Sequence, residues 1–289
     1  MGIASVLAMI DGGTGSDSAV RTALAVGRAF NAYVEFLHVE IEPESIIPVV
    51  AEGMPATTMS GLIEGAREMS AERAKAAQAV TRAAVDGAGL TLGDPDDDPV
   101  AGTFSVAWRR VLGSESSEGP RRARLFDLTV MARPSDEALL EGGSPLIDVL
   151  FESGRPVLMA PPTAPDAVGT TVAVAWRDTA DAARAVAAAN PFLREAGAVT
   201  LLTVQERDAE TPLPDVGRYL RRHGVKPTSV ALPEGSADTA SRLLAAAGEA
   251  GADLMVMGAY GHSRLRELIL GGVTRDVLKS AEIPVLMVH

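Results

Sequence analysis

The stretch DLMVMGAYGHSRLRELILGGVTRDVLKSAEIPVLMV, residues 253–288, decides the fold of this 289-residue chain. Apolar runs at 253–257 and 284–288 predict two buried strands, and 271–281 predicts a helix between them. Glycine occupies positions 258, 261, 271 and 272 around the intervening loop. Because a glycine inside a helix costs up to about 1 kcal/mol relative to alanine, this density of glycine indicates a backbone requirement.

Outside this stretch, runs rich in Val and Leu alternate with alanine-rich amphipathic ones, as in parallel strands joined by crossover helices. The chain is therefore predicted to be α/β. Further strands are expected at 5–10, 33–39, 105–111, 127–131, 156–160, 171–176, 199–204 and 228–232, with helices at 17–30 and 60–85. The proline-flanked acidic segment GDPDDDP, residues 93–99, is expected to be a solvated turn and not a calcium site.

The chain is also predicted to contain an internal duplication. DVLFESGRPVLMA, from Asp148, matches DVLKSAEIPVLMV, from Asp276, at an offset of 128 residues. DLTVMA at 127–132 matches DLMVMG at 253–258 at an offset of 126, so the first copy lacks two residues of the loop. PPTAPDAVG, residues 161–169, has the composition of a linker. Two domains are expected, at 1–162 and 163–289.

The glycine-rich loop is expected to lie where α/β proteins bind ligands. It joins the carboxyl end of a strand to the amino end of a helix, where unpaired N–H groups and partial positive charge suit phosphate. Gly258 and Gly261 would let the chain turn beneath a ligand, and Gly271 and Gly272 would expose the first amides of the helix. The alternative is that these glycines serve only a tight crossing of strand and helix.

The motif resembles the universal stress protein signature, in which two residues separate the first two glycines, nine follow, and a third glycine precedes Ser or Thr. Gly258, Gly261 and Gly271 fit this spacing, and VLAMIDGG, VAVAWRD, PVLMA and PVLMV extend the resemblance across the chain. It implies two tandem Rossmann-like domains of the adenine nucleotide alpha hydrolase type, each a five-stranded parallel sheet flanked by helices. It also implies that ATP or another adenine nucleotide is bound, alone or with magnesium, without fast turnover.

The resemblance places glycines 258, 261, 271 and 272 around a triphosphate and the Val204 backbone at adenine. The implied site comprises Trp176, Arg177, Asp178, Val204, Met257, Gly258, Gly261, His262, Gly271, Gly272 and Val273. Two positions depart from the family pattern: Gly272 stands where a hydroxyl residue is expected, and Arg177 where an acidic residue usually ends the first strand. Arg177 either pairs with phosphate or is a solvated surface charge. His262 either donates to phosphate or is structural.

In the N-terminal copy the loop is degraded. Asp11 fits the acidic position of the first strand, and Gly143 with Ser144 keeps the end of the motif. Ala132 and Ser135 replace the first two glycines, and two residues are missing. We expect no triphosphate site in this half, which leaves it a structural or regulatory role.

Composition excludes several other functions. A net charge of -12, from 26 basic and 38 acidic residues, argues against nucleic acid or an anionic membrane surface as partner. The absence of cysteine rules out disulfides and thiolate sites and fits the cytoplasm. The four histidines lack metal-ligand spacing, and there is no serine nucleophile elbow, so neither a metal site nor a catalytic residue is expected. GTGSDS, residues 13–18, only partly matches the loop of ATP pyrophosphatases.

We therefore expect a cytoplasmic, nucleotide-responsive binding protein with one site, in its C-terminal half, and not an enzyme. The main alternative is a scaffold that acts through protein partners or another small ligand, and a slow ATPase is the third. The two closing strands, 156–160 and 284–288, are expected to pair antiparallel within one chain as an intramolecular pseudo-dimer. Any further homodimer would then use helices.

Overall fold

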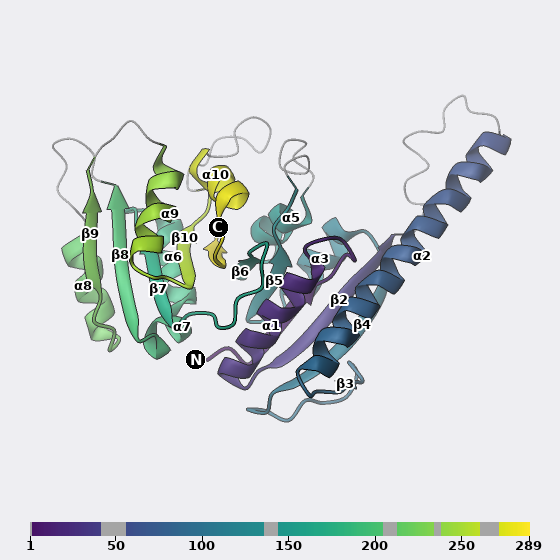
Figure 1. Cartoon of the computed structure of the whole chain (residues 1–289), viewed down its shortest axis with the longest axis horizontal. Coiled ribbons are helices and arrows are strands. Elements are labelled where there is room, and N and C mark those ends of the chain that lie inside the picture. Colours follow the sequence, from purple (N-terminus) through teal and green to yellow (C-terminus); the bar gives the residue numbers. More distant parts are fainter. Residues whose placement is uncertain (1, 42–55, 136–143, 205–212, 234–237, 261–271) are drawn as a thin grey trace.

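A computed structural model describes residues 2–41, 56–135, 144–204, 213–233, 238–260 and 272–289 (Figure 1). The N-terminal half, as we call β1 to β6 with their helices, comprises β1 (Ser5–Met9), α1 (Ser16–Phe30), β2 (Tyr33–Ile41), α2 (Ala56–Gly87), β3 (Leu92–Gly93), β4 (Ser105–Gly113), α3 (Glu115–Ala123), β5 (Leu128–Ala132), α5 (Pro145–Glu152) and β6 (Val157–Ala160). The C-terminal half comprises β7 (Thr171–Ala175), α6 (Ala180–Ala188), α7 (Asn190–Glu195), β8 (Ala198–Val204), α8 (Leu213–Arg222), β9 (Thr228–Leu232), α9 (Thr239–Glu249), β10 (Leu254–Gly258), α10 (Gly272–Ser280) and β11 (Val285–Val288).

The strands form one 11-stranded sheet in the order β3-β4-β2-β1-β5-β6-β11-β10-β7-β8-β9. Neighbouring strands are parallel except at the seam between the halves, where β6 and β11 pair antiparallel with Leu158 opposite Leu286. The predicted α/β class, with five parallel strands per half, is confirmed, and β3 is a short addition at one edge. The predicted antiparallel pairing of the closing strands is confirmed as well.

Helices cover both faces of the sheet, because the strands bury alternate side chains on each side. One apolar cluster includes Val6, Phe36 and Leu201 and packs against α1, α2, α6, α7 and α8. The other includes Leu7 and Leu202 and packs against α3, α5, α9 and α10. Burial on both faces explains why the strands are nearly continuous apolar runs in the sequence. Among the described helices, none combines the length and the apolarity that crossing a membrane requires.

The duplication is visible in a carboxylate clasp at the base of each half. Asp127 accepts hydrogen bonds from the amides of Ala4 (2.9 Å) and Ser5 (3.0 Å), at the start of β1. Asp253 accepts from the amides of Thr170 (3.0 Å) and Thr171 (2.9 Å), at the start of β7. Each carboxylate thereby satisfies backbone donors that the sheet leaves unpaired.

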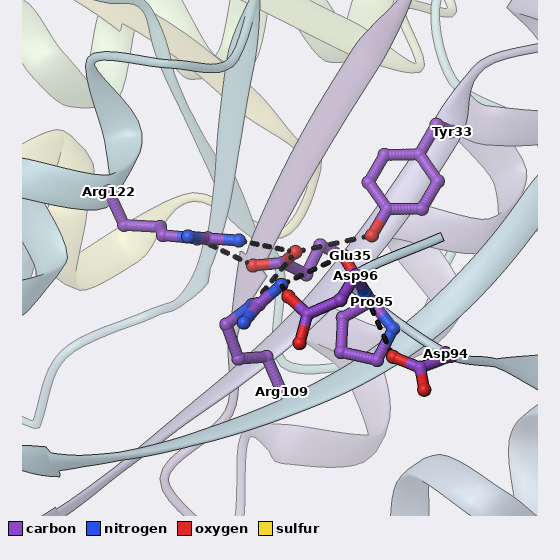
Figure 2. Close-up of polar contacts among 7 residues, drawn as sticks. All are labelled: Tyr33, Glu35, Asp94, Pro95, Asp96, Arg109 and Arg122. Carbon is purple, nitrogen blue, oxygen red and sulfur yellow. Dashed lines mark hydrogen bonds and ion pairs between the residues drawn. The ribbon is translucent and has the colours of Figure 1, made fainter. Parts of the chain in front are cut away.

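A buried ion-pair network joins β2, β4 and α3 (Figure 2). Glu35 on β2 is 1% exposed, and Arg122 of α3 donates to both of its carboxylate oxygens at 2.7 Å. Arg109 of β4 lies 3.2 Å from Glu35 Oε2 and also donates to Asp96 Oδ1 (2.7 Å) and the Pro95 carbonyl (2.8 Å). The segment 93–99 is the solvent-exposed turn that the sequence predicts, and Arg109 in addition attaches it to the sheet.

Candidate functional site

The carboxyl ends of β7, β8 and β10 lie at one edge of the C-terminal half. Met257 is opposite Ala175 in the β10–β7 register, and the Trp176 amide donates to the Leu202 carbonyl of β8 (2.7 Å). Val204, the last residue of β8, lies two residues farther along. The first turn of α10 reaches the same edge, since Thr274 Oγ1 accepts from the Tyr260 amide (3.4 Å). This is the location that the sequence predicts for a ligand.

The predicted site residues fall into two groups. Most of the described ones lie along this edge: Met257 is buried, Trp176, Val204, Gly258 and Val273 are half-buried, and Arg177, Asp178 and Gly272 are exposed. Gly261, His262 and Gly271 lie outside the described residues, so their predicted contacts with phosphate remain predictions. Trp176 Nε1 is buried without a hydrogen-bond acceptor in the part of the chain that the structure describes.

Gly258 is needed for packing, whatever else it does. A Cβ at this position would lie 2.5 Å from the Ala182 amide nitrogen and 2.7 Å from the Asp181 carbonyl carbon, at the start of α6. In the N-terminal half the equivalent residue is Ala132, and the residue of the adjacent helix entry that it contacts is Gly15. A Cβ at Gly15 would lie 2.7 Å from Ala132 Cβ. The C-terminal half therefore has its glycine at the strand end, Gly258, and the N-terminal half has it at the helix entry, Gly15. This exchange explains why position 132 needs no glycine, without reference to a ligand.

The corresponding edge of the N-terminal half is partly filled. The Asp11 carboxylate accepts from the Gly13 amide and the Ser16 hydroxyl, both at 2.8 Å, so it closes the entry to α1. Gly12 adopts φ 84, and a Cβ there would lie 2.4 Å from the Arg73 carbonyl oxygen of α2. A cavity of about 200 Å³ remains, and its lining includes Asp11, His38, Met69, Ser70, Arg73 and Glu115. Within the described residues, no three His, Asp or Glu side chains are grouped to hold a metal ion.

Glu115, in the first turn of α3, carries an unfavourable charge. Burial raises the pKa of this carboxyl, nearby Asp11 raises it further, and Arg73 lowers it. Below the pKa that Glu115 has in the unfolded chain, its carboxyl is protonated in both the folded and the unfolded state. No charge is then buried on folding, so the carboxyl does not lower the stability. As the pH rises between the unfolded and the folded pKa, the unfolded state loses its proton first, so the stability of the fold decreases.

We predict that Glu115→Gln raises the melting temperature at pH 7 and leaves it unchanged near pH 4, since glutamine has no charge to desolvate. Thermal melts followed by circular dichroism at both pH values measure this difference. Glu118→Gln is the matched control, because Glu118 occupies the same first turn. An equal gain at both pH values in Glu115→Gln would contradict an electrostatic origin.

The fold is that of a Rossmann-like α/β protein, the class in which ligands bind at the carboxyl ends of the strands. The model of the universal stress protein family matches residues 169–289, so the C-terminal half is a universal stress protein domain. Over 34 residues the chain is 56% identical to a universal stress protein of Synechocystis sp., a match that spans only 12% of the length of each protein.

Two solved structures resemble almost the whole chain. A universal stress protein from Archaeoglobus fulgidus is 17% identical with a TM-score of 0.65, and the alignment covers 98% of this chain and 95% of that one. A functionally unknown protein from Pseudomonas aeruginosa is 15% identical with a TM-score of 0.55, and the alignment covers 99% and 92%. At such low identity these likenesses establish the fold alone.

Proposed function

We propose that the chain is a tandem universal stress protein, with domains at 1–162 and 163–289, whose C-terminal half binds ATP or another adenine nucleotide. The observation that carries this proposal is the match of the universal stress protein model to residues 169–289. In this half the carboxyl ends of the strands and the start of α10 lie at one edge of the sheet. The protein then acts in the cytoplasm as a nucleotide-responsive binding protein and not as an enzyme, with protein partners that read its state.

In this proposal the first turn of α10 receives the phosphates. Backbone N–H groups at a helix start have no partner within the helix and carry partial positive charge, both of which favour an anion. Gly272 is exposed and Val273 half-buried in that turn. The Val204 backbone at the end of β8 would contact adenine, and a magnesium ion would accompany the phosphates if one is used.

The difference between the strand ends of the two halves supports one nucleotide site per chain. In the N-terminal half, Asp11 already holds the entry to α1, and α2 packs against Gly12. Ala132 replaces the first glycine of the motif. These features support a structural or regulatory role for that half and no second triphosphate site.

A scaffold without nucleotide is the second candidate, and the packing of Gly258 favours it because that glycine needs no ligand to explain it. The two are separated by denaturing the purified protein and chromatographing the supernatant for bound nucleotide, then titrating the nucleotide-free protein with ATP and magnesium by calorimetry. Failure to retain or bind any adenine nucleotide would establish the scaffold.

We predict that Gly272→Ser increases ATP affinity about fivefold, which corresponds to about 1 kcal/mol from one added hydrogen bond to a charged acceptor. Among the described residues, a Cβ at Gly272 would meet only Asp276 Oδ2, at 3.8 Å. Gly272→Ala is the control, since it adds the Cβ without the hydroxyl. Calorimetric titration of both variants tests the prediction, and equal affinities would show that no phosphate reaches this residue.

A further inference from the structure

The two halves also meet at an aromatic contact beside the predicted site. Phe151, on α5 of the N-terminal half, lies 5.1 Å from the Tyr260 ring and 4.2 Å from the His289 ring, centroid to centroid. Tyr260 belongs to the C-terminal half and directly precedes Gly261. We call these three side chains the aromatic brace. It links an N-terminal helix to the residue at which the chain leaves β10 for the glycine-rich segment.

Tyr260 needs such support because its backbone is in an unfavourable region. Its φ is 58, a left-handed conformation that residues with a large side chain rarely adopt. Such a conformation persists only where the surroundings determine it. Because the Tyr260 amide also donates to Thr274 in the first turn of α10, the conformation of this residue bears on the helix start that would receive the phosphates.

Several contacts hold residues 259 and 260 in place. The Ala259 amide donates to the Val288 carbonyl (2.9 Å), and the Tyr260 amide donates to Thr274 Oγ1 (3.4 Å) in the first turn of α10. His289 Nδ1 lies 3.2 Å from the Ala259 carbonyl oxygen, which can only accept, so this nitrogen carries the proton. Phe151 contacts both rings, and among the ring contacts and hydrogen bonds described for Tyr260 it is the side chain that comes from the other half.

The Tyr260 side chain is buried enough that its position depends on the side chains packed against it. Burial raises the pKa of its phenol to about 12, against the opposing effect of Arg275. Its hydroxyl is buried and has no hydrogen-bond partner within the described residues. Within the described residues, packing and not a side-chain hydrogen bond holds the ring.

The arrangement is not reciprocal. By the offsets of the duplication, Tyr260 corresponds to Pro134 and Phe151 to Lys279, so the N-terminal half receives no equivalent aromatic contact. Arg133 instead donates to the Ala281 carbonyl of the C-terminal half (3.3 Å). The N-terminal half thus contributes an aromatic side chain to the strand exit of the C-terminal half, and the C-terminal half contributes none at the equivalent position.

We propose that Phe151 is a positioning residue for the nucleotide site of the C-terminal half, acting through the backbone conformation of Tyr260. This inference rests on the function proposed above. The N-terminal half, without a triphosphate site of its own, sets the affinity of its neighbour by keeping the exit from β10 in the binding-competent conformation. When a variant lowers the population of that conformation, the apparent affinity decreases by the same factor.

The first test does not need a nucleotide. The chain has three tyrosines, so protein labelled with 3-fluorotyrosine gives a resolvable ¹⁹F spectrum, in which Tyr260→Phe identifies the Tyr260 resonance. Phe151→Ala is expected to broaden this resonance, because Tyr260 then exchanges between conformations; a shift alone would follow from the loss of the neighbouring ring. Phe30→Ala is the matched control, because Phe30 forms another aromatic pair between the halves, with Phe192 at 4.9 Å. It is expected to leave the Tyr260 resonance in place.

The second test titrates the same proteins with ATP and magnesium. Phe151→Ala should bind on the order of tenfold more weakly than the wild type, with Phe30→Ala unchanged and Phe151→Leu intermediate. Should Phe151→Ala fail to fold, Phe151→Leu replaces it in both tests. A Tyr260 resonance as sharp as in the wild type, equal ATP affinity in Phe151→Ala and wild type, or equal losses in Phe151→Ala and Phe30→Ala would each overturn the proposal. If the wild type binds no ATP, the proposed function fails, and the ¹⁹F line widths still decide whether Tyr260 keeps a single conformation without Phe151.

Discussion

Replacing Arg122 with methionine is expected to lower the free energy of unfolding by about 3 kcal/mol, because it removes the principal partner of a buried carboxylate. Glu35 is 1% exposed and receives two hydrogen bonds of 2.7 Å from Arg122, in the paired geometry that makes such contacts strong (Figure 2). Methionine keeps most of the apolar stem of Arg122 but loses the guanidinium that lies over the Phe126 ring, 5.9 Å from its centroid. Arg109 and the Tyr33 hydroxyl stay near Glu35, so its charge is not left wholly unpaired. The loss of unfolding free energy should therefore lie at the lower end of the range for breaking a buried ion pair.

Urea unfolding followed by circular dichroism measures the change, with Arg21→Met as the control. Arg21 pairs with Asp17 at 2.9 Å, but their side chains are 53% and 52% exposed, so that substitution should cost less than about 1 kcal/mol. The double variant Glu35→Leu with Arg122→Met should be more stable than Arg122→Met alone, because no buried charge is left unpaired. A loss no larger than that of Arg21→Met would show that water reaches Glu35.

The duplication explains why the architecture could be predicted so closely. Strands buried on both faces give apolar runs, and the strand expected at 228–232 is β9 (Thr228–Leu232) without correction. The matching ends at Asp148 and Asp276 identified the two closing strands, which the structure pairs with each other. Helix α2 begins at Ala56 and ends at Gly87, a few residues beyond the expected 60–85, because helix ends are the least sharply defined part of a helix.

Contacts between residues distant in the sequence were beyond prediction. The acidic run at 93–99 shows no pattern that identifies Arg109 as the partner of Asp96, since the bond depends on how β4 lies beside the loop. Phe151 and Tyr260 meet only because the halves join at β6 and β11. At the site, the sequence left open whether Gly258 serves a ligand or a tight crossing of strand and helix, because the opposing backbone of α6 was not visible in it.

The glycines at the two strand–helix crossings give the second large effect that we predict. Gly258→Ala should lower the free energy of unfolding by about 3 kcal/mol, because its Cβ would lie 2.5 Å from a backbone nitrogen and the start of α6 would have to move. Gly248→Ala is the control. Gly248 lies within α9, where a Cβ meets nothing within 4 Å, so alanine there should stabilise the fold by up to about 1 kcal/mol. Urea denaturation measures both changes.

The N-terminal crossing allows the packing explanation to be tested by rescue. Gly15 has φ -85 and ψ -7, which alanine adopts freely, so the cost of Gly15→Ala comes from the 2.7 Å approach to Ala132 Cβ and should be about 2 kcal/mol. Ala132→Gly removes that atom, at a cost of up to about 1 kcal/mol for a glycine in a strand. Ala132→Gly removes the atom that the new Cβ at position 15 would clash with, so the double variant should be more stable than the sum of the two single changes predicts. A double-mutant cycle should therefore give a favourable coupling energy of about 2 kcal/mol. A coupling near zero would mean that the swapped glycines of the two halves do not serve one contact, and Gly258 would again need a ligand to explain it.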